Sequence, residues 1–126
     1  MTEKELQAAA SGFLDTAFNL GEPETAVTEY VGDKYVQHNP QVPDGAEAFI
    51  AFVHSMRSQF PEMHLDIKRV IIQGEMVVTH SHLTLTPGEP GLAIADFFRF
   101  EDGKAVEHWD VIQNIPDTSA NSNGMF

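Results

Sequence analysis

The chain has 126 residues, the size of a single domain, and its 42% of apolar residues can form a core around one internal pocket. A formal net charge of −12 argues against binding to nucleic acid or anionic membranes, because both need Lys and Arg. Cysteine is absent, which excludes disulfides, a thiolate nucleophile and cysteine-ligated metal sites. No apolar run approaches the roughly 20 residues of a membrane span, and the charged N-terminal residues do not resemble a signal peptide, so we expect a soluble, cytoplasmic protein.

The first sixty residues have the 3.6-residue periodicity of amphipathic helices. Thr2 and Glu5 have the spacing of a capping box, so a helix should begin there. Pro23 suits the first turn of a second helix. We predict helices at residues 2–20, 22–31 and 44–60, with a turn at residues 32–34 and a short extended segment at residues 35–40.

From residue 64 onward, apolar residues alternate with the period of 2 that is typical of half-buried strands. Strands are predicted at residues 64–73, 76–86, 92–100 and 105–113, followed by a polar tail at residues 114–126. Helices followed by an antiparallel sheet indicate a single α+β domain, whose curled sheet would enclose a pocket. The tail ends in Met125 and Phe126, which should either cover a neighbour's surface or fray.

The last predicted hairpin carries the residues best suited to acid–base chemistry. Alternation places Asp96 on one face with Phe98, and Asp110 with His108. A three-residue loop with Gly103 in the left-handed region would pair Asp96 with His108, whereas a two-residue turn would shift the register and split the set. Carboxylates among aromatic residues have shifted pKa values, so an aspartate there suits a general base. The alternative is an Asp–His hydrogen bond that only stabilises the hairpin.

Further candidate residues are histidines outside this hairpin. His80 and His82 alternate on a predicted strand, where they could chelate a metal, but the chain has no dedicated ligand motif and we expect no metal. His54 borders the apolar stripe of the third helix, where a packed histidine is the commoner outcome. We include His80 and His54 among the candidate substrate-binding residues.

The segment before Pro40 carries two hydrogen-bond donors, His38 and Asn39. Both side chains can donate to a carbonyl or enolate oxygen, and Tyr35 could orient them. The alternative is a capped turn in which Asn39 bonds its own backbone. The chain has no nucleophile elbow, no P-loop and no dinucleotide motif, which disfavours serine hydrolysis and hydride transfer.

Several segments resemble the SnoaL-like polyketide cyclases of the nuclear-transport-factor-two-like superfamily, and in particular its small bacterial branch of predicted SnoaL-like aldol-condensation enzymes. The resemblance is carried by residues 35–40, 44–45, 96–104 and 107–113. It implies a cone-shaped barrel, in which a curved, mainly antiparallel sheet wraps over three N-terminal helices, a deep pocket and a homodimer. In the cyclases an aspartate of the last strand is the general acid/base of an intramolecular aldol closure without cofactor or metal, and Asp110 matches it. A pocket histidine of the cyclases falls here on Asp96, which departs from the family's pattern.

The sequence therefore predicts an acid/base enzyme, independent of cofactors, that acts on a small carbonyl or polyketide-like compound through an enolate. The expected catalytic residues are Asp110, Asp96 and His108, and the expected substrate-binding residues are His38, Asn39, Tyr35, His80, His54 and Phe98. Two alternatives stay open: a non-catalytic ligand-binding module with the same fold, and a hydrolase or dehydratase in which the aspartates position a water. The expected partners are a small-molecule ligand and a second copy of the chain.

Overall fold

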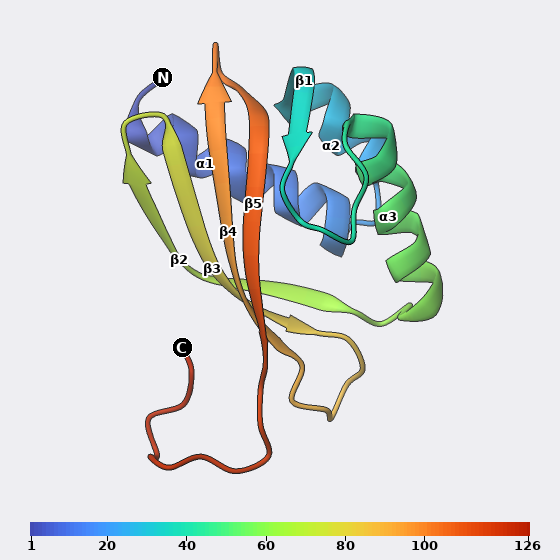
Figure 1. Ribbon diagram of the computed structural model, residues 1–126, viewed down its shortest axis with the longest axis vertical. Helices are drawn as coiled ribbons and strands as arrows, with labels where there is room; N and C mark the ends of the chain where they lie inside the picture. The colour runs from blue at the N-terminus through green and yellow to red at the C-terminus, as the bar shows by residue number, and fades with distance from the viewer.

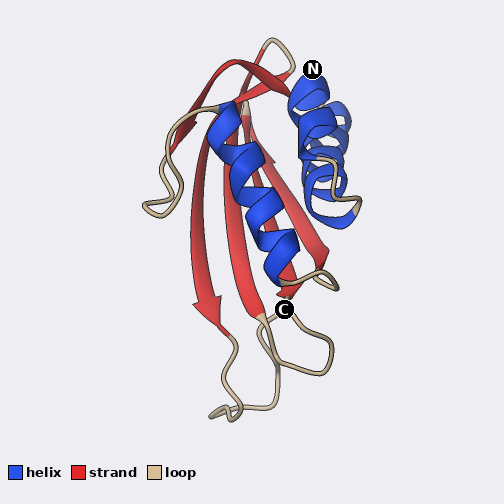
Figure 2. Ribbon diagram, turned by 90° about the vertical axis from the view of Figure 1, so that its right-hand side faces the viewer, coloured by secondary structure: helices blue, strands red, loops and turns tan.

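Three helices, a π-helical turn and five strands make up the fold in the computed structural model, which describes residues 1–126. The elements are α1 (Glu3–Leu14), the π-helical turn η1 (Asp15–Asn19), α2 (Pro23–Tyr30), β1 (Val31–Gln37), α3 (Ala46–Gln59), β2 (His64–Gln73), β3 (Met76–Thr84), β4 (Leu92–Glu101) and β5 (Lys104–Asn114). The strands form one curved sheet in the order β1-β5-β4-β3-β2, with β1 parallel to β5 and the other pairs antiparallel (Figure 1). Figure 2 shows the helices against one face of this sheet. The predicted α+β class is confirmed, although one strand of the sheet, β1, precedes the last helix. No helix has the length and apolar character needed to cross a membrane.

The segment after α2 differs from the prediction. Residues 32–34 form no turn, because the chain passes directly from α2 into β1, which runs beside β5. Gly32 serves close strand packing here, since a Cβ at this position would lie 3.0 Å from Val106 Cγ1. β1 is therefore longer than the predicted segment at residues 35–40, and it brings Tyr35 and Gln37 to the sheet.

The N-terminal helix begins at the predicted capping box. Thr2 Oγ1 accepts the Glu5 backbone N–H at 3.1 Å, and the Glu5 carboxylate accepts the Thr2 backbone N–H at 2.8 Å. At its other end the helix widens into η1, where the Asn19 side chain bonds both the N–H and the carbonyl of Leu65 on β2. These bonds hold the end of the helix to the sheet, so that Phe18 of η1 reaches the interior.

The core lies between the helices and the concave face of the sheet. Phe13 of α1 is at its centre, with ring centroids 4.9 Å from Phe49 of α3 and 5.7 Å from Phe98 of β4. Buried apolar residues from α1, α3 and every strand join this cluster. Aromatic pairs of this kind add to the stabilisation that burial gives, so the inner face of β4 is fixed against the helices.

The β4–β5 hairpin pairs differently from the prediction. Asp102 and Gly103 have φ of 50° and 78°, so they form a two-residue turn rather than a three-residue loop. A bulge on β5 then inserts one residue, and Asp96 lies opposite Asp110 rather than opposite His108. Compared with the predicted pairing, the two-residue turn shifts the register by one residue, and the bulge shifts it by one more. The total shift of two residues leaves each side chain on the face that was predicted for it. The two aspartates and His108 share the inner face as predicted. The prediction that Asp96 and His108 lie directly opposite each other across the two strands was wrong.

The C-terminal tail returns to the outer, convex face of the sheet (Figure 1). The Phe126 ring lies 4.9 Å from that of His82 and 5.3 Å from that of His80, and the Lys68 ammonium lies 5.6 Å from its centroid. The tail of this chain therefore covers its own sheet.

Candidate functional site

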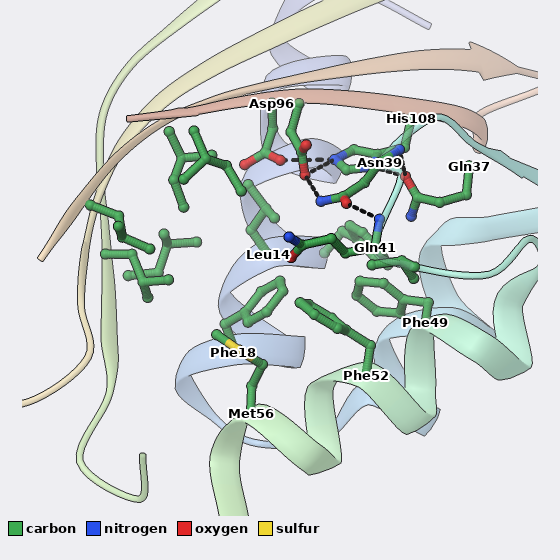
Figure 3. A pocket seen from close by; sticks show the side chains of 18 of the residues that line it. Leu14, Phe18, Gln37, Asn39, Gln41, Phe49, Phe52, Met56, Asp96 and His108 are labelled. Atoms are coloured by element: carbon green, nitrogen blue, oxygen red, sulfur yellow. Dashed lines mark hydrogen bonds and ion pairs between the residues drawn. The ribbon is translucent and has the colours of Figure 1, made fainter. Parts of the chain in front are cut away.

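The concave face of the sheet and the helices enclose a cavity of about 330 Å³. Most of its wall is apolar, with Phe18, Phe52 and Met56 on the helical side. Figure 3 shows that most of the polar side chains gather at one side, where β1, the loop after it, β4 and β5 meet. These polar residues are Gln37, Asn39, Gln41, Asp96, His108 and Asp110, and Asn114 at the end of β5 adds one more polar side chain to the wall. No lysine or arginine lines the cavity. A ligand there meets an apolar wall and one polar, acidic corner.

Asp96, His108 and Asp110, which we call the acid–base cluster, form this corner. His108 Nε2 lies 2.8 Å from Asp96 Oδ1 and 3.9 Å from Asp110 Oδ2. Asp96 and His108 are each 7% exposed. Asp110 follows two residues after His108 on β5 and opposes Asp96 on β4, so strand pairing alone places all three side chains together.

The Gln37 side chain shows which hydrogen-bonding role the Nδ1 atom of His108 has. Its Oε1 accepts the Asn39 backbone N–H at 3.1 Å, so the amide oxygen, and not the nitrogen, faces His108 Nδ1 at 2.7 Å. Nδ1 therefore carries a hydrogen and donates it to Gln37. Nε2 then either accepts from a protonated Asp96 or, protonated itself, donates to an ionised one. In both cases one proton is held between Asp96 and His108.

Burial raises the pKa of Asp96 above its ordinary value. The hydrogen bond and charge of His108 oppose this rise, and the neighbouring Asp110 carboxylate adds to it. An aspartate in this state can keep its proton at a pH where an exposed one has lost it. Asp96 therefore suits the role of a proton store beside Asp110.

Asn39 holds the second aspartate. Its Nδ2 donates to Asp110 Oδ2 at 2.9 Å, while its Oδ1 accepts the Gln41 backbone N–H at 2.8 Å, which fixes the amide orientation. The Asp110 side chain is 12% exposed, and its other oxygen, Oδ1, makes no hydrogen bond within the chain. Asp110 is thus a fixed carboxylate with one oxygen free to take a proton.

The loop that carries Asn39 is closed by Asp44 and Gly45, the two residues that follow the segment 35–40 in the family resemblance. The Asp44 carboxylate accepts the Gln37 backbone N–H at 2.7 Å, and the Gly45 N–H donates to the Tyr35 carbonyl at 3.1 Å. Gly45 has a φ of 94°, a conformation that favours glycine. The motif therefore positions Gln37 and Asn39 for their contacts with the acid–base cluster.

Tyr35 lines the same cavity, and its hydroxyl is buried and has no hydrogen-bond partner. Its ring is nearly parallel to that of His108, at a centroid distance of 6.2 Å and an interplanar angle of 12°. Burial raises the pKa of Tyr35 well above its usual value of 10, and the negative charges of Asp96 and Asp110 raise it further. The hydroxyl is therefore a donor that keeps its proton.

The structure places Tyr35, Asn39 and Phe98 on the cavity wall beside the acid–base cluster, as expected for substrate-binding residues. Gln37, which sequence reasoning missed, belongs with them. It shares the strand parity of the buried Tyr35, and this alternation could have revealed its inward direction.

Three of the residues expected to bind substrate, all histidines, do not line the cavity. His38 points outward, where its Nε2 contacts Glu107 at 2.7 Å and its ring stacks on Trp109, because the preceding Gln37 points inward. His54 is on the exposed side of α3 and pairs with Glu24 of α2. His80 is on the outer face of β3, where it contacts Arg69, because the alternate residues of that strand are the buried ones.

The acid–base cluster also offers one imidazole and two carboxylates whose ligand atoms lie within 4.8 Å of one another. Such donors suit zinc or another first-row transition metal. Metal binding here would displace the proton held between Asp96 and His108, because a metal ligand must be deprotonated. Proton storage and metal binding are therefore mutually exclusive uses of the cluster.

A family model described as the SnoaL-like domain matches residues 10–108. The chain belongs to the SnoaL-like family.

Among solved structures it is similar to TsrD from Streptomyces laurentii, with 23% identity, a TM-score of 0.74 and coverage of 89% of this chain and 90% of that one. A candidate polyketide cyclase from Acidithiobacillus ferrooxidans gives 23% identity, a TM-score of 0.73 and coverage of 89% and 91%. Another, from Bacillus cereus, gives 22% identity, a TM-score of 0.76 and coverage of 89% and 78%. No curated protein sequence matches significantly. At these identities the structural neighbours show a common fold.

Proposed function

We propose that this SnoaL-like protein is an acid/base enzyme, independent of cofactors, that acts on a small uncharged carbonyl compound. The observation that carries the proposal is the Asp110 carboxylate at the polar corner of an apolar cavity, with one oxygen held by Asn39 and the other free. Asp110 removes the proton next to the carbonyl group, and the C–H electron pair moves into an enolate. The enolate carbon then attacks a second carbonyl of the same molecule, and Asp110 returns the proton to the alkoxide that forms.

The cavity favours an uncharged substrate. An anion would meet two aspartates and no lysine or arginine on the wall, so it would lose its hydration without gaining a counter-charge. A volume of about 330 Å³ is at the lower end of the range for small-molecule sites. The family match and the likeness to candidate polyketide cyclases agree with a substrate that carries carbonyl groups on an apolar skeleton.

Asp96 and His108 support Asp110 by holding a proton between them, and His108 Nε2 lies 3.9 Å from Asp110 Oδ2. A negative charge on the substrate can be neutralised from this store while Asp110 carries the α-proton. Because Asp96 and Asp110 lie directly opposite each other on β4 and β5, their roles as acid and base can exchange.

The test is solvent-deuterium exchange at the α-carbon of small β-dicarbonyl and hydroxy-ketone compounds, followed by proton NMR. The native protein should exchange at least one of them above the buffer rate, and Asp110→Asn should lower that rate by about 10²-fold or more. Asp117→Asn, an equivalent change in the exposed tail, is the matched control and should leave the rate unchanged. Equal rates in native protein and Asp110→Asn would remove Asp110 as the base.

Two other functions fit the same geometry. The directly opposed Asp96 and Asp110 could position a water, which favours a hydrolase or dehydratase. Turnover of an epoxide or a hydroxy-ketone, with no exchange of enolisable ketones, would support that function. Ligand binding without any turnover would support a binding module.

We further propose that the protein forms a homodimer through the part of the outer sheet face that its own C-terminal tail leaves exposed. Ile71, Val78, Phe97 and Trp109 align across four strands on that face, and Ile71 is 58% exposed. Val111, on the same face, is 64% exposed. Apolar surface of this kind marks association sites. Light scattering on a sizing column should give twice the chain mass, and Val111→Lys should lower it; a monomeric native protein would refute the proposal.

A further inference from the structure

The reaction proposed above needs a hydrogen-bond donor for the oxygen that becomes negative in the enolate. The sequence suggested His38 and Asn39 for this role. The structure removes the first, because His38 lies outside the cavity against Glu107 and Trp109. Asn39 is directed to Asp110, where it holds the base rather than the substrate. The donor has to be sought among the other cavity residues.

Tyr35 has the only hydroxyl that fits. Three buried side-chain oxygens lack a hydrogen-bond partner in the structure, those of Tyr35, Thr79 and Ser81. Of these residues only Tyr35 lines the cavity. Buried polar groups are nearly always paired, so an unpaired one in a residue of a cavity wall needs an explanation, and a ligand in that cavity can supply the missing partner.

The ring of Tyr35 is held on three sides. Its centroid lies 6.2 Å from that of Phe13, 5.9 Å from that of Phe49 and 6.2 Å from that of His108. The residue is 3% exposed. Packing of this kind leaves rotation of the O–H bond as the main freedom of the side chain. A donor fixed before the substrate arrives needs no reorganisation when charge develops on the substrate oxygen.

The same hydroxyl is close enough to Asp96 and Asp110 for their charges to act on it. A substrate whose carbonyl oxygen contacts Tyr35 therefore presents its neighbouring carbon atoms to the end of the cavity that holds the acid–base cluster. This arrangement places a donor at the oxygen and a free carboxylate oxygen near the α-proton.

We propose that the Tyr35 hydroxyl donates a hydrogen bond to the carbonyl oxygen of the substrate and to the enolate oxygen that replaces it. This inference rests on the proposed function, in which Asp110 takes the α-proton. The C–H pair forms the C=C bond of the enolate, the carbonyl π pair moves onto the oxygen, and Tyr35 keeps its own proton throughout. Tyr35 is then a catalytic residue that stabilises charge, and Asp110 is the one that moves the proton.

The first test is kinetic. Tyr35→Phe removes one oxygen and keeps the ring, so α-exchange should fall by about 10²-fold in kcat with a smaller change in KM, because the hydrogen bond strengthens as charge develops. Tyr30→Phe is the matched control, since Tyr30 is the only other tyrosine and does not line the cavity. It should exchange at the native rate. A native rate in Tyr35→Phe would overturn the proposal.

The second test does not depend on turnover. Benzophenone is an uncharged aromatic ketone without an α-hydrogen, so it can accept the hydrogen bond but cannot react. Labelled with ¹³C at its carbonyl, it should show a downfield carbonyl shift when bound to the native protein and to Tyr30→Phe, and a smaller shift with Tyr35→Phe. Equal shifts in all three proteins would overturn the proposal, even if Asp110 proved to be the base. Loss of exchange in Asp110→Asn together with equal shifts would separate the two claims.

A third measurement avoids any change at Tyr35. Tyr35 is the only tyrosine left in Tyr30→Phe, so growth on 3-fluorotyrosine gives a single ¹⁹F probe at the proposed donor. Benzophenone should move this resonance further than diphenylmethane, which has the same shape and no carbonyl oxygen. A resonance that benzophenone leaves unchanged, including one unchanged because the ketone does not bind, would refute the inference.

Discussion

Replacing Asp96 by Asn should make the protein progressively more stable than the native form as the pH rises above about 4. Asp96 is 7% exposed, and burial raises its pKa in the folded protein. In the unfolded chain the pKa returns to its reference value of about 3.9. The folded state therefore binds this proton more tightly than the unfolded state does.

The sign of the pH dependence follows from this difference. Below about pH 4, Asp96 is protonated in both states, and its contribution to stability is fully present. As the pH rises from there toward the raised folded-state pKa, the unfolded chain loses the proton first, and stability falls by up to about 1.4 kcal/mol per pH unit. Above that pKa the loss is complete and constant. Asparagine cannot ionise, so Asp96→Asn does not undergo this loss.

The assay is urea unfolding at a series of pH values, followed by the fluorescence of Trp109, the only tryptophan. The unfolding free energy of Asp96→Asn minus that of the native protein should increase with pH across this window. Asp117→Asn, in the exposed tail, should show no such increase. A difference for Asp96→Asn that stays flat or falls with pH would show that Asp96 is not held with a raised pKa, and would remove the proton store from the proposed mechanism.

Three further predictions address the rest of the site. Asn39→Ala should lower the α-exchange rate about tenfold, because Asp110 loses the donor that orients it. It should also lower the unfolding free energy by about 1–3 kcal/mol. A native exchange rate would show that the Asn39 contact is dispensable. His38→Ala, His54→Ala and His80→Ala should each keep the exchange rate within about twofold, as expected for surface residues outside the cavity, and a large loss in any of them would contradict their placement. Zinc should bind the acid–base cluster and suppress exchange, with recovery on adding a chelator; loss of activity when the untreated protein is chelated would point instead to a metal enzyme.

The elements of this fold could be predicted because local chemistry determines them. The capping box at Thr2 and Glu5 and the alternation along β2 to β5 are each read from a few neighbouring residues. The turn expected at residues 32–34 was wrong because Gly32 serves close approach to Val106, a contact between strands far apart in the sequence. A glycine can serve either a turn or the close approach of two strands, and only the residue packed against it distinguishes these two uses.

The sequence predicts which residues of the site share one face of the sheet, but it does not predict which of them lie opposite each other on neighbouring strands. Parity alone put Asp96, His108 and Asp110 on one side of the sheet, and this was confirmed. Their order across the hairpin depends on a bulge that no short-range signal in the sequence marks. Alternation with the buried Tyr35 indicates that Gln37 points inward and His38 outward, but the contacts of Gln37 depend on how β1 joins β5, a parallel pairing that alternation does not specify.

The π-helical turn at residues 15–19 has a consequence for how a cavity like this one can change its size. A π turn is an α-helix that has accommodated one extra residue, and a deletion there would return the segment to ordinary helix. Phe18 lies inside this turn, so deleting Phe18 itself would keep the flanking residues in their helical register and remove one aromatic ring from the cavity wall. The apolar end would then widen while the distant acid–base cluster kept its geometry. Substrate size and chemistry are thus separable in this fold, since a length change of one residue at the end of the first helix alters the size of the cavity and leaves the acid–base cluster unchanged.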